Sequence, residues 1–219
     1  MEIYEKDVAT IRSTQFDKII GRYPSAIKTY KLLKKYFKSN SRILDYGSGN
    51  GIFLRILQRN GHEAYGWEPS QALVDAVNVF QNIKNNSSDI ADIENVKFDI
   101  ILSLRTLAYI PNKEEVIKFW AQMLNEGGIL ILENSNYKYW ERYKTNEPMH
   151  SGWNISREVE KEFLKYFILK ERLIGFAPYY HGCISDGIVR IILKKFVNFI
   201  DRALGKFFSL FAPHYIYIY

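Results

Sequence analysis

The sequence predicts an α/β fold, with a mostly parallel β-sheet and helices on both faces. Through the first two thirds of the chain, short apolar runs alternate with segments whose apolar residues have helical spacing. The first apolar run ends in Asp45 and leads into three glycines at alternate positions, Gly47, Gly49 and Gly51. Glycine has no Cβ and adopts positive φ readily, so such a turn lets the backbone approach a ligand closely. In sheets of this class, ligands bind beyond the carboxyl ends of the strands.

The elements before and around the glycine turn follow from periodicity and end signals. Residues 1–40 are predicted to form a helical cap, in which the segment Pro24 to Phe37 has an apolar stripe with lysines opposite. A core is predicted over residues 41–136, where the first strand precedes the turn and a helix follows from Ile52. The next strand ends at Glu68, and the Pro69-Ser70 pair suits the start of another helix.

The second half of the core contains three more predicted strands. The third strand is expected to end at Ser88-Asp89-Ile90. The run Phe98 to Ser103 is apolar throughout most of its length and predicts a buried strand. The fifth strand is introduced by two glycines and covers Gly127 to Asn136.

Residues 137–219 are predicted to form a further region with its own elements. A helix is expected from Ser156, as N-cap, to Tyr166, and a sixth strand from Phe167 to Phe176. Apolar residues from Gly187 to Phe211 share one helical face, with basic residues on another. The alternating residues 212–219 predict a last strand, so residues 187–211 would be an insertion before it. The length of 219 residues suits one domain over the whole chain.

The glycine pattern distinguishes between two nucleotide-handling classes. Dinucleotide-binding dehydrogenases use G-x-G-x-x-G, which places a pyrophosphate at a helix N-terminus. Here the third glycine, Gly51, comes one residue early, and Asp45 precedes the first glycine by two positions. A nicotinamide dehydrogenase is therefore disfavoured, and the acid at Glu68 has the spacing expected of a ribose-binding carboxylate.

The D-x-G-x-G-x-G pattern resembles the first motif of the S-adenosylmethionine-dependent methyltransferases with a Rossmann-like fold. The resemblance covers about residues 40 to 176 and rests on the motifs in combination. It implies a seven-stranded, mostly parallel sheet whose last strand is antiparallel. It also implies S-adenosylmethionine as cofactor, with S-adenosylhomocysteine as product.

The resemblance also implies a set of cofactor-binding positions. Asp45 and the glycines would lie around the methionine end, and Glu68 would accept from both ribose hydroxyls. Asp89 would lie near the adenine amino group, with the Ile90 backbone beside the ring. The implied cofactor-binding residues are Asp45, Gly47, Ser48, Gly49, Gly51, Glu68, Pro69, Asp89, Ile90, Leu104 and Arg105.

His150 is the candidate general base. It lies in an aromatic-rich segment, Tyr137 to Trp153, that follows the fifth strand. Residues Pro148 to His150, with Trp153 to Ser156, resemble a stretch found in many small-molecule methyltransferases. A loop histidine that only packs or forms a hydrogen bond is an equal alternative, and a base is needed only if the acceptor must lose a proton. His181 is a weaker second candidate, for which a local structural role is favoured.

Differences between this sequence and the motifs of related methyltransferases narrow the class of methyl acceptor. Nucleic-acid amino-methyltransferases carry an Asn/Asp-Pro-Pro-aromatic motif where this chain has Ser103 to Thr106, so nucleic acid is an unlikely partner. Many small-molecule members have Glu-His where this chain has Ala108 and Tyr109, which disfavours a metal site. Arg105 could meet an anionic group of the substrate or form a salt bridge with a neighbour.

Composition sets broader limits. Hydrophobic residues make up 47% of the chain, which argues against disorder, and the net charge of +6 fits an acidic small molecule, nucleic acid, an anionic membrane surface or simply a basic soluble protein. One cysteine, Cys183, excludes an intrachain disulfide and a cysteine metal cluster. The N-terminus lacks the layout of a signal peptide, and a cytoplasmic enzyme is expected.

The expected function is S-adenosylmethionine-dependent, metal-independent methylation of a small molecule, with oxygen favoured over nitrogen or carbon. One alternative is a non-catalytic module that keeps the fold for binding. Another is a methyltransferase for a lipid-linked acceptor, with residues 187–211 lying on a membrane surface. These residues could equally cover the protein's own sheet, a substrate pocket or a second copy, so the oligomeric state stays open.

Overall fold

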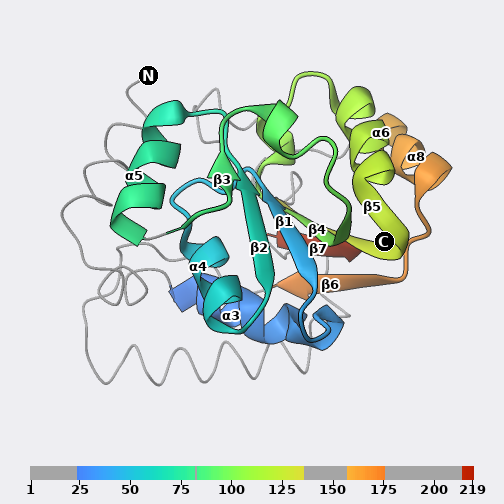
Figure 1. Cartoon of the computed structure of the whole chain (residues 1–219). Helices are drawn as coiled ribbons and strands as arrows, with labels where there is room; N and C mark the ends of the chain where they lie inside the picture. The colour runs from blue at the N-terminus through green and yellow to red at the C-terminus, as the bar shows by residue number, and fades with distance from the viewer. Residues whose placement is uncertain (1–23, 82, 136–156, 176–213) are drawn as a thin grey trace, which may run out of the picture. The chain divides into compact units, whose positions relative to one another are not determined.

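The computed structural model describes residues 24–81, 83–135, 157–175 and 214–219. Within these ranges, seven strands form one sheet in the order β3-β2-β1-β4-β5-β7-β6 (Figure 1). The helices, 3-10 turns (η) and strands are α3 Pro24–Leu33, η1 Lys34–Tyr36, β1 Arg42–Tyr46, α4 Ile52–Arg59, β2 Glu63–Trp67, α5 Gln71–Gln81, β3 Asn86–Ser87, η2 Ile90–Asp92, β4 Phe98–Leu104, η3 Leu107–Tyr109, α6 Lys113–Met123, β5 Leu124–Ser135, α8 Arg157–Tyr166, β6 Glu171–Gly175 and β7 His214–Ile218.

The chain forms two compact units. The first comprises Met1–Leu104 and Phe119–Leu130, and the second comprises Arg105–Lys118 and Ile131–Tyr219. The α/β fold class predicted from the sequence is confirmed. The expectation of a single domain over residues 1–219 stays a prediction.

In the first unit, β1 lies between β2 and β4 and pairs with both in parallel. Asp45 is in register with Gly66 of β2 and with Leu102 of β4. β2 pairs in parallel with β3 on its other side. Ile43 and Leu44 on β1 are completely buried, and their side chains point to opposite faces of the sheet. Apolar burial on both faces is the pattern of a parallel strand covered by helices on each side.

Aromatic and apolar side chains fill the core of this unit. The ring of Tyr46 stacks on Trp67 with centroids 4.4 Å apart and meets the completely buried Trp120 of α6 edge-on at 5.2 Å. Burial raises the pKa of Tyr46 to about 12. The helix α4 joins the core through its apolar face, and Ala26, Ile27 and Tyr30 of α3 pack against it.

In the second unit, β7 runs antiparallel to both of its neighbours. Glu133 of β5 and Leu173 of β6 are both in register with Ile216 of β7. The prediction of an antiparallel last strand is therefore confirmed, with β6 at the edge of the sheet. The completely buried Phe163 of α8 stacks on Tyr219, with ring centroids 5.2 Å apart.

Three strand boundaries differ from the sequence-based expectations. The third strand ends at Ser87, because the Asp89 side chain accepts from the Ala91 N–H and starts the turn η2. The sixth strand starts at Glu171 rather than Phe167, because the Phe167 N–H still donates to a helical carbonyl of α8. The fifth strand starts at Leu124, before its glycines.

Other expectations fall on residues outside the described ranges. These are the first part of the predicted cap, the N-cap Ser156 and the amphipathic segment 187–211. Within the residues that are described, no helix has both the length and the apolar character needed to cross a membrane.

Asp99 ties the amino ends of three strands together in the first unit. Its Oδ2 accepts from the backbone N–H of Arg42 at 2.8 Å, and its Oδ1 accepts from Asn125 Nδ2 at 2.8 Å. These residues belong to the starts of β1, β4 and β5. The Arg42 N–H, with the Asn125 amide and nearby cations, holds the pKa of Asp99 below its usual value of 3.8.

We predict that Asp99→Asn lowers the free energy of unfolding at pH 7 by about 1–2 kcal/mol, because charge-assisted hydrogen bonds are replaced by weaker neutral ones. Because the folded-state pKa is depressed, the unfolded chain binds more protons between the two pKa values, and the contribution is lost as pH falls through that window. Urea unfolding at pH 7 and pH 3 should show the wild-type advantage shrinking at pH 3. Asp75→Asn, on the exposed face of α5, is the control and should change stability by less than about 0.5 kcal/mol. An advantage that is equal at both pH values would contradict this assignment.

Candidate functional site

The glycine turn after β1 is hydrogen-bonded to the end of β2. The N–H groups of Gly47 and Ser48 both donate to the carbonyl oxygen of Trp67, at 2.7 and 3.1 Å. All three glycines have left-handed backbones, with φ of 87° at Gly47, 51° at Gly49 and 69° at Gly51. The turn then closes on itself, because the Gly51 N–H donates to the Ser48 carbonyl at 2.9 Å, and α4 begins at the next residue.

Glu68 lies directly after β2, and its carboxylate is part of the same turn. Its Oε2 accepts from the Gly49 N–H at 3.0 Å, and its Oε1 accepts from the Ser70 N–H at 3.1 Å. Only 5% of Glu68 is exposed. Burial raises the pKa of this carboxyl, and the two N–H donors act in the opposite direction. The fold therefore brings Gly49 and Glu68 into direct contact, a hydrogen bond that the sequence did not predict.

The glycines of the turn are required for different reasons. A Cβ on Gly51 would lie 2.4 Å from Cγ1 of Val77 and 3.4 Å from Cδ1 of Ile83, so packing against α5 excludes a side chain there. A Cβ on Gly49 would have no other atom within 4 Å. The Gly49 backbone therefore faces open space, while its N–H is held by the Glu68 carboxylate.

A buried polar cluster supports the turn from β3. The Ser48 hydroxyl donates to Asn86 Oδ1 at 2.8 Å, and Asn78 Nδ2 donates to the Asn86 carbonyl at 2.9 Å. A Cβ on Gly66 would lie 2.2 Å from Asn86 Oδ1, so the glycine in β2 makes room for the amide. Asn86 was not singled out from the sequence, because it stands in a polar run with no motif of its own. The hydroxyl of Ser48, a predicted cofactor residue, is thus bound within the protein.

The remaining predicted cofactor residues of this unit are placed as follows. Asp45 is buried, with 3% exposed, and it precedes the turn on β1. Pro69 and Asp89 are exposed and Ile90 is half-buried; each of these three follows the end of its strand. Leu104 is the half-buried last residue of β4. The roles of these residues in cofactor binding stay predictions.

Arg105 belongs to the second unit, where it is tied to Glu133. Its backbone N–H donates to the Glu133 carbonyl at 2.8 Å, and its Nε lies 4.0 Å from Glu133 Oε2. The Arg105 side chain is 50% exposed and that of Glu133 is 2% exposed. The backbone of Arg105 is left-handed, with φ of 64°. Of the two roles that the sequence left open for Arg105, the ion pair with a neighbour is present.

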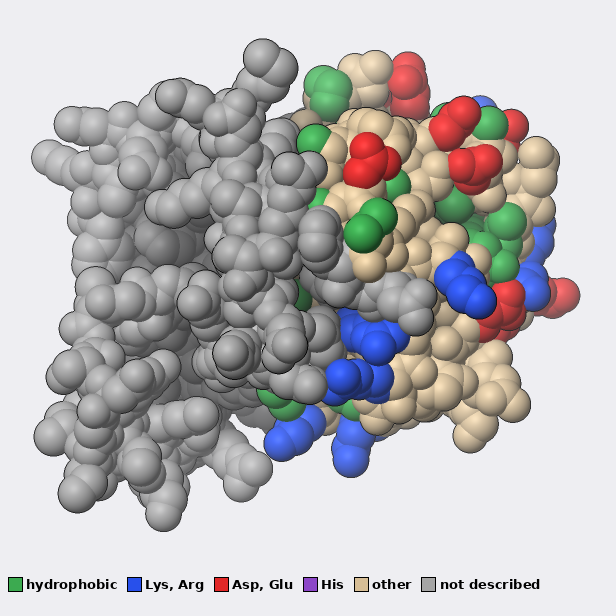
Figure 2. Space-filling view, turned by 60° about the vertical axis from the view of Figure 1, so that its left-hand side comes forward, with side chains coloured by type: hydrophobic (Ala, Val, Ile, Leu, Met, Phe, Trp, Pro, Cys, Tyr) green, Lys and Arg blue, Asp and Glu red, His purple; other side chains and the backbone are tan. Residues whose placement is uncertain are grey.

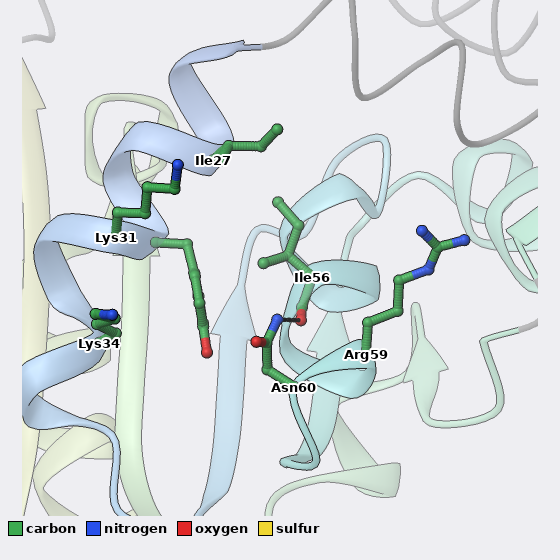
Figure 3. A pocket seen from close by; sticks show the side chains of 7 residues that line it. Ile27, Lys31, Lys34, Ile56, Arg59 and Asn60 are labelled. Atoms are coloured by element: carbon green, nitrogen blue, oxygen red, sulfur yellow. Dashed lines mark hydrogen bonds between the residues drawn. The ribbon is translucent and has the colours of Figure 1, made fainter.

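A separate hollow of about 390 Å³ lies between α3 and α4 (Figure 3). Three basic residues line it: Lys31, Lys34 and Arg59. Asn60, which follows α4, also lines the hollow, and its Nδ2 donates to the Ile56 carbonyl at 2.8 Å. Several Lys and Arg side chains also gather on the lower part of the described surface in Figure 2. Arg59 ends the helix that starts after the glycine turn, so this hollow is distinct from the turn.

The predicted acceptor-side residues lie outside the described part of the chain. These are His150, His181 and the segment Tyr137 to Trp153. Their roles stay predictions. Among the described residues, no three His, Cys, Asp or Glu side chains are grouped so that they could hold a metal ion.

Comparison with known proteins places this geometry in a family. A family profile described as a methyltransferase domain matches residues 18–171. The chain belongs to this methyltransferase family. The resemblance stated from the glycine turn and Glu68 is thereby confirmed.

Individual relatives of this methyltransferase chain are distant. The ubiquinone biosynthesis O-methyltransferase of Coxiella burnetii is 30% identical over 105 residues, which are 44% of this chain and 45% of the relative. The match thus spans less than half of that protein's length. A S-adenosylmethionine-dependent methyltransferase from Archaeoglobus fulgidus is 20% identical, with a TM-score of 0.57 over 90% of this chain and 93% of its own. A Pyrococcus horikoshii protein is 16% identical, with a TM-score of 0.62 over 90% of both chains. These structures share the fold.

Replacing Gly51 with alanine should destabilise this methyltransferase more than replacing Gly49. We predict that Gly51→Ala lowers the free energy of unfolding by about 2–4 kcal/mol, through a clash with Val77 added to left-handed strain. Gly49→Ala should cost about 1–2 kcal/mol, because it carries the strain alone. Urea unfolding measures both, with Gly61→Ala (φ 82°, open space) as the control outside the turn. Equal losses at the three positions would contradict the assigned packing role of Gly51.

The left-handed backbone of Arg105 leads to a second prediction. Arg105→Gly should be more stable than Arg105→Ala by about 1 kcal/mol, since both variants lose the guanidinium but only glycine relieves the backbone. At the next residue, Thr106, φ is −95°, so glycine should there be less stable than alanine. Thermal unfolding of the four variants checks both signs. The same order at both positions would argue against strain at Arg105.

Proposed function

We propose that the chain transfers a methyl group from S-adenosylmethionine to an oxygen of a small-molecule acceptor, without a metal ion. One observation carries the proposal: the open Gly49 backbone lies beside the buried Glu68 carboxylate. A ligand that approaches Gly49 therefore meets a fixed, negatively charged acceptor of hydrogen bonds. A nucleoside with a ribose diol has matching donors.

The acceptor capacity of Glu68 supports this match. A carboxylate offers about four lone-pair positions. The N–H groups of Gly49 and Ser70 occupy one on each oxygen, so each oxygen retains capacity for a hydroxyl. Hydrogen bonds to an ionised acceptor are the stronger kind, and burial excludes competing water. The two N–H groups also fix the orientation of the carboxylate before a ligand arrives.

In this proposal, the other predicted cofactor residues would complete the binding surface around the turn. In this proposal Asp45, the glycine turn and Ser48 hold the methionine end through backbone and carboxylate groups. Pro69, Asp89, Ile90, Leu104 and the Arg105 backbone would border the remaining part of the cofactor. Asp45 is next to the last residue of β1, and each of the other residues ends or follows a strand, which is where ligands bind in such sheets.

The chemistry requires mainly alignment. When bound, S-adenosylmethionine supplies a methyl group on a positively charged sulfur. The protein has to hold the acceptor oxygen in line with that methyl and exclude water, and orientation of this kind is worth about 7–11 kcal/mol. His150 is the proposed base where the acceptor hydroxyl must lose its proton.

The choice of an oxygen acceptor is supported by the Coxiella burnetii relative, which is named an O-methyltransferase. A small molecule is favoured over nucleic acid because residues 103–106 lack the amine-gripping motif of nucleic-acid methyltransferases. The absence of a metal is proposed because Ala108 and Tyr109 replace the Glu-His pair common in small-molecule members.

Calorimetry tests the proposal through the cofactor. S-adenosylmethionine and S-adenosylhomocysteine should bind with micromolar dissociation constants, whereas NADH should not compete. Glu68→Gln should weaken both by about 10- to 100-fold, because the charge-assisted bonds to the ribose are lost. Glu63→Gln removes an exposed carboxylate at the start of β2, the strand that precedes Glu68, and should leave affinity unchanged. Absence of binding at hundreds of micromolar would rule out the methyltransferase function. Binding of both ligands without turnover of any acceptor would favour a non-catalytic module.

A further inference from the structure

We propose that the hollow between α3 and α4 binds a phosphate monoester that carries an apolar group. The hollow has a volume of about 390 Å³, which is within the range of small-molecule sites, and all of its lining residues belong to the first unit. The inference goes beyond the proposed function, because this second site includes neither the glycine turn nor Glu68. It is carried by the position of two lysines, by the charge around them and by the apolar residues beside them.

Lys31 and Lys34 lie on the side of their helical segment that is turned toward α4. With Ile27 and Tyr30 they follow the spacing i, i+3, i+4 and i+7, which brings residues to one face of a helix. This face is turned toward α4, because Ile27 and Tyr30 pack against the buried cluster that includes Ile56. Apolar residues would normally continue such a contact. Two lysines stand there instead, and they line the hollow between the helices (Figure 3).

No acidic residue balances these lysines within the two elements that border the hollow. Neither residues 24–36 nor Ile52–Arg59 contain an aspartate or a glutamate. Both lysines are exposed, and neither forms a hydrogen bond or an ion pair with another residue of the described ranges. Two ammonium groups that are three residues apart on one face repel each other, so an anion placed between them is stabilised by both.

A phosphate monoester matches the charge of the two lysines. It carries a charge of about −1.5 to −2 at pH 7 and offers three strong acceptor oxygens. A lysine ammonium binds phosphate as a point charge, whereas a carboxylate is best matched by the planar fork of arginine. In Figure 3 the guanidinium of Arg59 is turned away from α3, so we assign the phosphate contacts to Lys31 and Lys34.

The remaining lining of the hollow suits an apolar group on the ester. Ile27 and Tyr30 from α3 and Ile56 from α4 lie beside the lysines. Inorganic phosphate would leave these side chains in contact with water. An ester with a short carbon chain would cover them as well, and removal of apolar surface from water is favourable. The hollow is therefore matched by a molecule with both parts.

The test compares hexyl phosphate, inorganic phosphate and hexanol. Binding of each to the full chain is measured by calorimetry at low ionic strength, because salt screens the contacts of exposed charges. The variant is the double substitution Lys31→Gln with Lys34→Gln. The control is Lys118→Gln with Lys161→Gln, which removes the same charge from exposed positions of α6 and α8.

The wild type should bind hexyl phosphate at least about 10-fold more tightly than inorganic phosphate or hexanol, because only the ester contacts both parts of the hollow. The variant at Lys31 and Lys34 should weaken the binding of hexyl phosphate by about 10-fold. The control should weaken it by less than about twofold. Saturation with S-adenosylhomocysteine should leave the binding of hexyl phosphate unchanged.

Vesicles distinguish the two sources of such an ester. Co-sedimentation with vesicles that contain phosphatidic acid, but not with phosphatidylcholine alone, identifies the ester as a lipid headgroup if the variant at Lys31 and Lys34 loses it. Binding of hexyl phosphate without co-sedimentation identifies an ester that is free in solution.

Several results would overturn the inference. They are equal affinities for hexyl phosphate and hexanol, an affinity that survives the substitutions at Lys31 and Lys34, an equal loss in the control, and displacement of hexyl phosphate by S-adenosylhomocysteine. Circular dichroism checks that the variants fold. If the double variant does not fold, Lys34→Gln takes its place and must weaken binding at least threefold. Failure of S-adenosylhomocysteine to bind the wild type overturns the proposed function and leaves this inference standing.

Discussion

Two hydrogen bonds to one carbonyl oxygen, that of Trp67, set the geometry on which the candidate site depends. They join the turn after β1 to the last residue of β2. The next residue, Glu68, therefore lies within hydrogen-bond distance of the Gly49 N–H. The turn and Glu68 depend on each other. The Glu68 carboxylate is oriented by the N–H of Gly49 in the turn and by the N–H of Ser70, two residues after it. Parallel pairing of β1 and β2 provides the register that makes this meeting possible.

Within the turn, the same residue type serves two separate needs. Gly51 is constrained from the protein side, where a neighbouring helix leaves no space. Gly49 has space around it, and its conformation and its bond to Glu68 are what single it out. A sequence motif records both as identical letters. In the structure, Gly51 is packed against its neighbours and Gly49 has open space around it, so substitutions at the two positions should be interpreted differently.

The sequence was sufficient for features that depend on local pattern. The alternation of elements predicted the α/β class, and the glycine motif with the acid at Glu68 predicted the family. It was insufficient where the deciding partner is remote in sequence and chemically ordinary. Asn86 supports Ser48 from 38 residues away, and no pattern marks an asparagine in a polar run. The backbone of Arg105 is fixed by a carbonyl on another strand, so its left-handed conformation has no local signal either.

Gly66 and Asn86 have a consequence for how this family can diverge. The amide of Asn86 occupies the volume that a side chain at position 66 would need, and the same amide holds the Ser48 hydroxyl. A homologue cannot enlarge position 66 alone, because the added atoms would meet the amide at 2.2 Å. The two positions should therefore covary during evolution: a larger residue in β2 should be accompanied by a smaller one in β3, and by a different partner for the serine of the turn.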